Sequence, residues 1–411
     1  MSEVIFIKKF LKLLSFCISI FCVVVFCVVS YYNNILPSNV VIYDDESIHF
    51  NTKIKITSKN QQKINNVSNL RQKQEQNYTT NLLALGVIPV KSVNIKVVNR
   101  RYVTLSGEPF GIKIFTKGVM VVGLSNVKTG VGNINPAKEI GINVGDIILS
   151  ANQKKVNSNE EFSKIINISN GNPVFLKIKR EDKILNLKLT PVKELDSGDF
   201  KAGLWVRDSS AGLGTMTFYS SVNGRFAGLG HAIVDVDTGV LLPINSGEIV
   251  KTKILSVNKS KPGAAGEICG VFTGERLGEL VKNTDCGLYG FYDNYETSKN
   301  MILVANKQDV KTGNAKIYTT LDKNGPKFYD CVIERIDYND SAHRNLLVRV
   351  TDEKLIKRAG GIVQGMSGSP IVQNGQLVGA LTNVFLNEPE KGYAVFADTM
   401  LEISQKTIKA S

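Results

Sequence analysis

The stretch GGIVQGMSGSP, Gly360–Pro370, decides how the rest of this chain is interpreted. It places one serine, Ser367, between Gly365 and Gly368, and it ends in Pro370. Glycine permits the left-handed backbone that a tight turn needs. Such a turn can expose a serine oxygen and aim backbone N–H groups at a single point beside it. The stretch therefore predicts a nucleophilic serine on a turn between strands. The plain alternative is a tight glycine loop without chemistry.

The spacing of this turn is typical of serine peptidases built from two β-barrels, in which a Gly-x-Ser-Gly-x-Pro turn carries the nucleophile. The match predicts Ser367 as the nucleophile and the N–H groups of Gly365 and Ser367 as the oxyanion hole. Long stretches on either side of the turn fit this interpretation. From about Gly198 onward the chain consists of short alternating segments broken by Gly, Asn and Asp, which predicts an all-β sandwich or barrel.

The chain contains three histidines, and one of them stands out as a candidate base. His231 ends an apolar, glycine-rich strand in RFAGLGHAIVDVDTG, whereas His49 lies in a polar segment and His343 follows turn residues. A lone histidine in such a strand is often only structural. However, histidine before serine is the order found in two-barrel peptidases, and it differs from subtilisin and the α/β-hydrolases. The pair predicts His231 as the general base of Ser367.

A third catalytic residue cannot be chosen from spacing. The acidic candidates between the histidine and the serine are Asp235, Asp237, Asp285, Asp309, Asp322, Asp330, Asp337, Asp340 and Asp352. Asp352, in VTDEKLIKR, has a structural alternative, since it could cap a short helix. Asp235 and Asp237 could simply shape the turn that follows His231.

Upstream of the β-rich region, the sequence resembles a PDZ domain of the bacterial protease type. The matching features are Gly145-Asp146-Ile147-Ile148 with Asn152, followed by a helix expected over 159–168 that begins at NSNEEF. In this resemblance Phe110-Gly111-Ile112 would be the carboxylate-binding loop, and an open strand edge would accept a peptide. The plain alternative is an α+β domain in which the Phe-Gly pair is a strand turn.

The N-terminus carries a stretch without charge from Leu13 to Tyr32, preceded by three lysines. Its length suits a membrane-crossing helix with a cytoplasmic N-terminus. A cleaved signal peptide is the alternative, although no small-x-small cleavage site follows. Residues 43–80 are polar and predict a tether or a weak helix.

The formal charge of +13 is spread along the chain without an arginine-rich run or interleaved aromatics. This pattern argues against nucleic-acid binding and suits a position near an anionic membrane. The six cysteines show no CxxC spacing, so neither a disulfide framework nor a metal site is expected, and no cofactor is implied.

A closer resemblance covers nearly everything after about residue 85. GLGHAIVDVDTG, NTDCGLYG and VRVTDEKLIKRAGGIVQGMSGSPIVQNGQLVGALTNVFLNEPEKGYAVFADTML are similar to the SpoIVB peptidase family, the stage IV sporulation peptidases. The resemblance implies a triad of His231, Asp352 and Ser367. One departure is Asn383, where family members commonly carry histidine; it leaves the triad untouched and suits a divergent paralogue.

The resemblance also implies a place and a role. The protein would sit in the forespore membrane with its catalytic part facing the intermembrane space, or be released there by self-cleavage. It would cut its own tether and a membrane-bound regulator of an intramembrane protease, and so trigger processing of a sigma factor. Two alternatives remain: a catalytically silent PDZ scaffold that binds peptides, and a purely structural anchor.

The predicted organisation is therefore multi-domain. Residues 1–32 form a cytoplasmic start and a transmembrane anchor or signal, and residues 33–84 form a polar tether that contains the cleavage site. Residues 85–195 form an α+β PDZ domain, and residues 196–411 form an all-β, chymotrypsin-like serine peptidase domain of two barrels.

Overall fold

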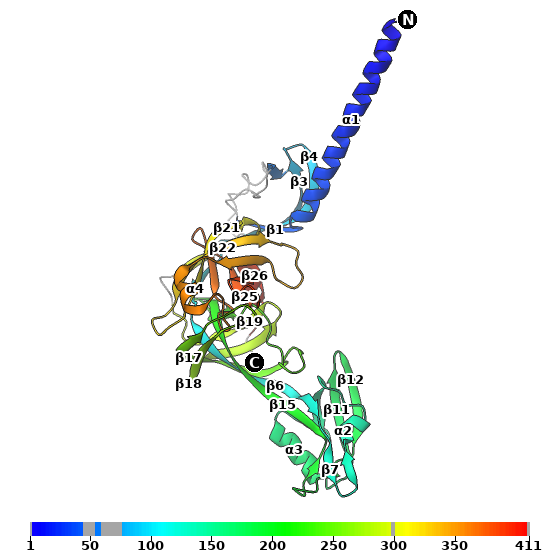
Figure 1. Ribbon diagram of the computed structural model, residues 1–411, viewed down its shortest axis with the longest axis vertical. Helices are drawn as coiled ribbons and strands as arrows, with labels where there is room; N and C mark the ends of the chain where they lie inside the picture. The colour runs from blue at the N-terminus through cyan, green and yellow to red at the C-terminus, as the bar shows by residue number, and fades with distance from the viewer. Residues whose placement is uncertain (1, 44–53, 59–75, 297–300, 409–411) are drawn as a thin grey trace.

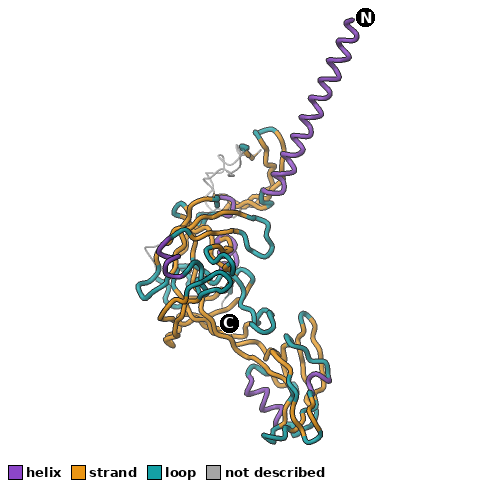
Figure 2. The backbone as a smooth tube through the Cα atoms, in the orientation of Figure 1, coloured by secondary structure: helices purple, strands orange, loops and turns teal. Residues whose placement is uncertain are grey.

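The computed structural model describes residues 2–43, 54–58, 76–296 and 301–408. The chain forms a long N-terminal helix, a small sheet at its base, a β-rich body, and a module that extends from this body on two long strands (Figure 1). Strands dominate the body, whereas the longest helix stands apart from it (Figure 2). The predicted order of an apolar helix, an α+β module and a mostly β region is confirmed.

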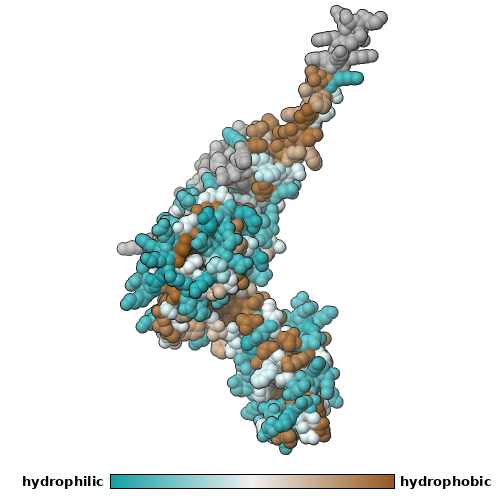
Figure 3. Space-filling view, viewed as in Figure 1, coloured by the Kyte–Doolittle hydropathy of each residue, from teal (hydrophilic) through white to brown (hydrophobic). Residues whose placement is uncertain are grey.

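The N-terminal helix, α1 (Ser2–Ile35), contains an apolar stretch, Lys12–Ile35, that is long enough to cross a membrane. The same stretch also fits a signal sequence, because both are apolar and lie near an N-terminus. Most of its side chains are exposed, apart from those near its C-terminal end such as Tyr32, and Figure 3 shows the stretch as a hydrophobic rod. An apolar surface of this kind is unfavourable in water and suits a lipid environment.

The base of α1 is built into a four-stranded sheet with the order β1-β4-β3-β2. Lys91 donates from Nζ to the carbonyl oxygens of Asn33 and Leu36, which satisfies acceptors at the end of the helix. Tyr32 and Leu36 are buried in the core of the sheet. Its strands are β1 (Asn39–Tyr43), β2 (Ile56–Ser58), β3 (Gln76–Ala84) and β4 (Ile88–Val98).

This sheet corrects the prediction of a tether over 33–84. The segment is polar on average, but it contains apolar residues such as Val40, Ile56 and Leu82, which pack together when the strands pair. His49 lies within residues 44–53, outside the described residues, and the predicted self-cleavage is assigned to no particular position between residues 33 and 84.

The first barrel of the body is a closed ring in the order β6-β15-β16-β19-β18-β17, with β17 returning to β6. Phe110, Ile112 and Ile114 alternate along β6 and point into its core together with Phe226 and Leu280. The strands are β6 (Pro109–Leu124), β15 (Leu204–Tyr219), β16 (Arg225–Gly228), β17 (Ile244–Asn258), β18 (Glu267–Thr284) and β19 (Gly287–Tyr292).

The second barrel closes in the same way, in the order β21-β22-β23-β26-β25-β24, with β24 returning to β21. Its elements are β21 (Gly313–Thr319), β22 (Lys327–Ile336), β23 (Leu346–Val350), α4 (Glu353–Ala359), β24 (Pro370–Gln373), β25 (Gln376–Val384), β26 (Lys391–Phe396) and α5 (Ala397–Gln405). Two further strands, β5 (Tyr102–Leu105) and β20 (Met301–Val304), pair with each other and connect the rings. The two-barrel prediction is therefore confirmed.

The PDZ module is inserted within the first barrel. Strands β6 and β15 run from the barrel into the module as one antiparallel pair, and Gly118 (φ +89°) lies where β6 passes from one core to the other. The module contains β7 (Val127–Thr129), β8 (Gly132–Ile134), α2 (Pro136–Glu139), β9 (Ile147–Ala151), β10 (Lys154–Lys155), α3 (Asn159–Ile168), β11 (Val174–Arg180), β12 (Lys183–Leu189), β13 (Val192–Lys193) and β14 (Phe200–Lys201).

This insertion changes the predicted partition of the chain between residues 85 and 117. Strand β4 belongs to the sheet beside α1, and β5 and the first half of β6 belong to the barrel. By contrast, helix α3 has the predicted bounds, and Ser158 caps it by accepting a hydrogen bond from the Glu161 N–H.

Candidate active site

Ser367 lies on the turn between α4 and β24, where two positions have a backbone conformation that favours glycine and one of them has no room for a side chain. Gly365 and Gly368 both have φ of +94°. A methyl group on Gly368 would lie 1.9 Å from the carbonyl oxygen of Thr215 and 2.4 Å from the backbone nitrogen of Leu229. The glycines of the motif therefore allow the turn to press against the first barrel.

The backbone N–H groups of this turn divide into two sets. Four of them donate to carbonyl oxygens, whereas the N–H groups of Gly365 and Ser367 have no acceptor within the described residues. Because buried N–H groups are nearly always paired, two free donors on one turn are available to an anion. The paired bonds run from Gln364 to Gly266 (2.8 Å), Met366 to Val363 (3.1 Å), Gly368 to Leu381 (2.7 Å) and Ser369 to Met366 (2.9 Å).

His231 lies just beyond the end of β16, and its ring is held by its own loop. Nδ1 lies 2.8 Å from the carbonyl oxygen of Ala232. A carbonyl can only accept a hydrogen bond, so Nδ1 carries the proton and Nε2 carries the lone pair of the neutral ring. Burial lowers the pKa of His231, despite the opposing effect of that hydrogen bond. A lowered pKa favours the neutral ring at neutral pH, with its lone pair on Nε2.

The two candidate residues approach each other through their neighbours. Thr215, in β15, accepts a hydrogen bond from Leu229 N and donates one from its own N–H to Ser367 O. The end of β16 and the serine turn are therefore both hydrogen-bonded to the same residue of β15. On the other side, a methyl group on Gly230 would lie 2.9 Å from Cγ2 of Thr382. Ser367 Oγ donates to the carbonyl oxygen of Thr382 at 2.7 Å. The site thus lies between the barrels, with the serine hydroxyl directed at Thr382.

Asp352 is placed as a helix cap. Its Oδ1 accepts hydrogen bonds from the N–H groups of Lys354 (2.9 Å) and Leu355 (3.0 Å), and its Oδ2 accepts one from Asp330 N at 3.3 Å. The structural alternative expected for Asp352 is therefore confirmed. In this arrangement the Ala232 carbonyl, and not a carboxylate, fixes the tautomer of His231.

A residue that the sequence did not single out anchors the loop of His231. Asn283, near the end of β18, accepts a hydrogen bond from Ile233 N (2.8 Å) and donates to the carbonyl oxygens of Ile233 (2.7 Å) and Leu242 (3.2 Å). Fifty positions separate Asn283 from Ile233 in the chain. No local signal could identify this contact, because it depends on how the strands of the first barrel pair.

The predicted carboxylate-binding loop of the PDZ domain needs correction. Phe110, Gly111 and Ile112 lie in the barrel half of β6, where they pair with β15 on one edge and β17 on the other. Phe110 and Ile112 are each 1% exposed, and a methyl group on Gly111 would lie 2.5 Å from the ring of Phe272. A strand paired on both edges offers no free backbone groups to a peptide, so these residues cannot form that loop here.

The other part of the PDZ pattern has a structural role. Asp146 is buried and receives hydrogen bonds from Arg180 Nε and Nη2, each at 2.7 Å, and from Asn143 N at 2.9 Å. The Gly145-Asp146 pair therefore ties the turn before β9 to the end of β11. Asn152 adopts φ of +48° and accepts from Phe175 N, which closes the next turn.

Metal binding has no obvious place in the described part of the chain, where no cluster of three or more His, Cys, Asp or Glu side chains could hold an ion. The arrangement of Ser367, His231 and two unpaired amides instead suits acyl transfer.

Comparisons with known proteins agree with this layout. Residues 198–401 match the family model described as SpoIVB peptidase S55, and residues 90–190 match a PDZ domain model. A Clostridium perfringens (strain 13 / Type A) protein, named for zinc metalloprotease activity, is 34% identical over 70 residues, which cover 17% of this chain and 21% of that protein. The chain thus spans only about a fifth of that relative.

Two solved structures are similar over parts of the chain. The PDZ domain of an SdrC-like protein from Listeria monocytogenes is 23% identical, with a TM-score of 0.18, and the match covers 22% of this chain and 87% of that one. The inactive form of the Rv3671c protease is 15% identical, with a TM-score of 0.27, and the match covers 48% of this chain and 85% of that one. The chain thus combines a region that matches the SpoIVB peptidase S55 family with a PDZ domain, the layout of a SpoIVB-like peptidase.

Proposed function

We propose that this protein is a membrane-anchored serine endopeptidase whose nucleophile is Ser367 and whose general base is His231. The observation that carries the proposal is the serine turn itself, where the N–H groups of Gly365 and Ser367 remain without acceptors among the described residues, together with a half-buried histidine whose pKa is lowered by desolvation. This combination is what acyl transfer needs: a nucleophile, a base and preorganised donors for an oxyanion.

The reaction begins when the Ser367 hydroxyl leaves the carbonyl oxygen of Thr382 and turns toward His231. Nε2 of His231 takes the proton as Oγ attacks the scissile carbonyl carbon, and the charge that develops on the carbonyl oxygen is held by the N–H groups of Gly365 and Ser367. The imidazolium then gives its proton to the leaving amine, and water releases the acyl group by the same route.

Asp352 is the proposed third member, on the strength of the family resemblance. In the geometry described, its carboxylate caps α4, so service to His231 would require a different arrangement from the one seen. Its influence on the serine turn is direct in either case, because α4 leads into Gly360 (φ +73°) and from there to Gly365.

The biological role follows the family. The peptidase would act in sporulation, cut its own segment between α1 and the barrels, and cut a membrane-bound regulator of an intramembrane protease, which leads to sigma-factor processing. Its place would be the forespore membrane, with the barrels in the intermembrane space. The apolar stretch Lys12–Ile35 and the PDZ domain support an anchored enzyme with a protein substrate.

The test compares the full chain with its Ser367→Ala variant, both in detergent micelles. A fluorophosphonate probe reports the activated serine, and mass spectrometry follows N-terminal fragments. Labelling and self-cleavage in the wild-type protein alone would support the peptidase. Equal behaviour of both folded proteins would support the catalytically silent PDZ scaffold instead.

A further inference from the structure

The segment that follows His231, residues 232–243, is called here the histidine loop. It links β16 to β17 and folds back on itself through a bridge between Val234 and Leu241. The hydrogen bonds of Asn283 hold the base of the loop on the first barrel. The tip of the loop, however, contacts Arg207 and Met120 on two other strands, β15 and β6.

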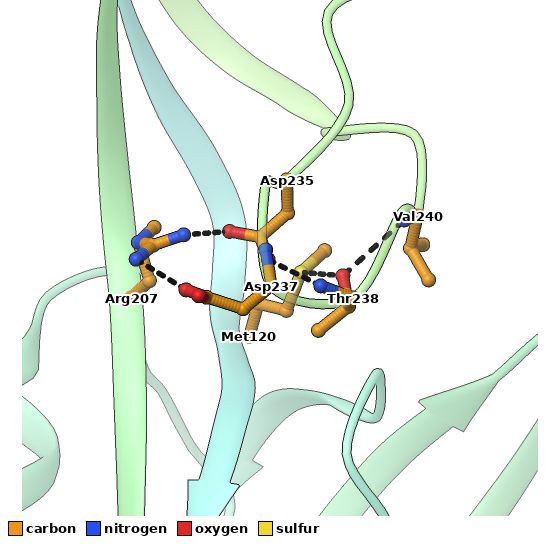
Figure 4. A network of polar contacts seen from close by, with 6 residues as sticks. All are labelled: Met120, Arg207, Asp235, Asp237, Thr238 and Val240. Atoms are coloured by element: carbon orange, nitrogen blue, oxygen red, sulfur yellow. Dashed lines mark hydrogen bonds and ion pairs between the residues drawn. The ribbon is translucent and has the colours of Figure 1, made fainter.

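The tip contains Asp235, which is 2% exposed. Its Oδ1 accepts hydrogen bonds from the N–H groups of Asp237 (3.1 Å) and Thr238 (3.0 Å), and its Oδ2 forms an ion pair with Nη1 of Arg207. Nη2 of the same guanidinium contacts Asp237 Oδ2 at 2.7 Å. Figure 4 shows this arrangement, in which one arginine from β15 faces two carboxylates of the loop.

Arg207 belongs to the PDZ side of β15, where it pairs with Met120 of β6. Met120 in turn pairs with Ile147 of β9, which places both strands in the PDZ sheet at this level. The loop also touches this sheet directly, since Thr238 Oγ1 donates to Met120 Sδ at 3.6 Å (Figure 4). Leu242 packs with Met120 and Ile147 in one buried cluster.

The buried carboxylate of Asp235 depends on its charged partner, Arg207. Burial alone would raise the pKa of Asp235, and the hydrogen bonds from Thr238 and Arg207 lower it below its ordinary value. A buried carboxylate is stable only with a partner, so the loss of Arg207 would leave an uncompensated charge at the tip. The tip would then move toward water, and the change would reach His231 four residues earlier in the chain.

We propose that Arg207 is a positioning residue for the peptidase reaction, which holds the histidine loop against the PDZ sheet through Asp235 and Asp237 and thereby fixes His231 in the site. The proposal rests on the function proposed above. Its consequence is that the catalytic histidine is supported by both modules: Asn283 fixes it to the barrel, and Arg207 fixes it to the PDZ domain. Any rearrangement of the PDZ sheet is therefore transmitted to the base.

The experiment uses the full chain in detergent micelles and four variants. Arg207→Ala removes the contact, and Arg207→Lys keeps the charge without the two-pronged geometry. Asp237→Asn removes the charge of one ion pair while the buried pair with Asp235 remains. Lys128→Ala is the matched control, because Lys128 forms an exposed ion pair with Asp196 (3.2 Å) on the same PDZ domain, away from the loop.

Two readouts are measured on each protein. Hydrogen–deuterium exchange at the imidazole C2 position, followed by mass spectrometry over a pH series, gives the pKa of His231, with His343 as an internal reference. The rate of fluorophosphonate labelling of Ser367 gives the reactivity of the site. The first readout does not depend on catalysis, so it reports on the loop even if the proposed function is wrong.

Arg207→Ala is expected to raise the pKa of His231 toward its ordinary value and to slow labelling by about ten- to a hundredfold, the size of effect that small misplacements of catalytic groups produce. Arg207→Lys should change the pKa of His231 and the labelling rate less than Arg207→Ala does. Asp237→Asn should change both quantities in the same direction as Arg207→Ala, and Lys128→Ala should match the wild-type protein.

An unchanged pKa of His231 in folded Arg207→Ala and Asp237→Asn proteins would overturn the proposal. If Arg207→Ala does not fold, Asp237→Asn decides, because it leaves no buried charge unpaired. Failure of the wild-type protein to react with the probe would reject the proposed function, while the exchange readout would still decide whether Arg207 holds His231.

Discussion

Ser367 Oγ donates a hydrogen bond of 2.7 Å to the carbonyl oxygen of Thr382. This contact holds the serine hydroxyl on β25, whereas His231 hydrogen-bonds its own loop. The hydroxyl of Ser367 and Nδ1 of His231 therefore have different hydrogen-bond partners in this structure. The proposed proton transfer requires the serine side chain to leave Thr382, while Gly365 and Gly368 already fix the backbone of the turn.

The hydroxyl of Thr382 offers a test of this site. Thr382 is 5% exposed, and its Oγ1 has no hydrogen-bond partner among the described residues. Removing a buried, unpaired hydroxyl relieves a desolvation cost, so Thr382→Val should stabilise the fold by about 1 kcal/mol. Labelling of Ser367 should change by less than about twofold, since the serine contacts only the carbonyl. Chemical denaturation and probe kinetics check both statements. A large loss of labelling would show that the hydroxyl serves the site.

The lowered pKa of His231 predicts the pH dependence of labelling. The base acts in its neutral form, so the rate rises with pH through the pKa of the folded protein. Because burial lowers that pKa below the ordinary 6.5, the midpoint of the rate profile should lie below 6.5. The profile is measured with the fluorophosphonate probe, and His231→Gln serves as the control without a base. A midpoint at or above 6.5 would contradict the buried, neutral histidine.

Asp352 can be tested with two variants that separate its charge from its role as a cap. Asparagine and aspartate cap helices about equally well, whereas alanine costs about 1 kcal/mol. If Asp352 supports His231 as proposed, Asp352→Asn should slow turnover by about 10³–10⁴ with little change in stability. Asp352→Ala should lose both activity and stability. Retained activity in Asp352→Asn, with loss only in Asp352→Ala, would assign the residue to the helix and not to the base.

The serine turn should tolerate no side chain at Gly368. A methyl group there would lie 1.9 Å from Thr215 O in a backbone with φ of +94°. Gly368→Ala should therefore destabilise the fold by about 3 kcal/mol or more and abolish labelling. Gly375→Ala is the control, because Gly375 also has a positive φ, of +74°, yet a methyl group would meet nothing within 4 Å. It should cost about 1 kcal/mol and leave labelling intact. Thermal unfolding and probe labelling of both proteins decide the comparison, and similar losses would contradict it.

Several features could be predicted because contiguous residues encode them. The turn around Ser367 depends on glycines one and two positions away, and α3 depends on the cap at Ser158 and on its own apolar face. The helix that follows Asp352 was predictable for the same reason. The apolar stretch of α1 needs no partner to be recognised, since length and composition define it.

Sequence alone thus determined the local chemistry of this protein: a serine turn, a histidine at a strand end, helix caps and an apolar helix. The tertiary structure decided which strands are neighbours. An alternating strand shows which face is buried but not which partner it pairs with. For that reason the sequence pattern predicts a loop at Phe110, Gly111 and Ile112, although these residues lie near the start of β6. The PDZ domain is inserted between β6 and β15, and Asn283 and Arg207 both contact the histidine loop. These features depend on contacts between residues that are distant in the sequence and come together only when the barrels close.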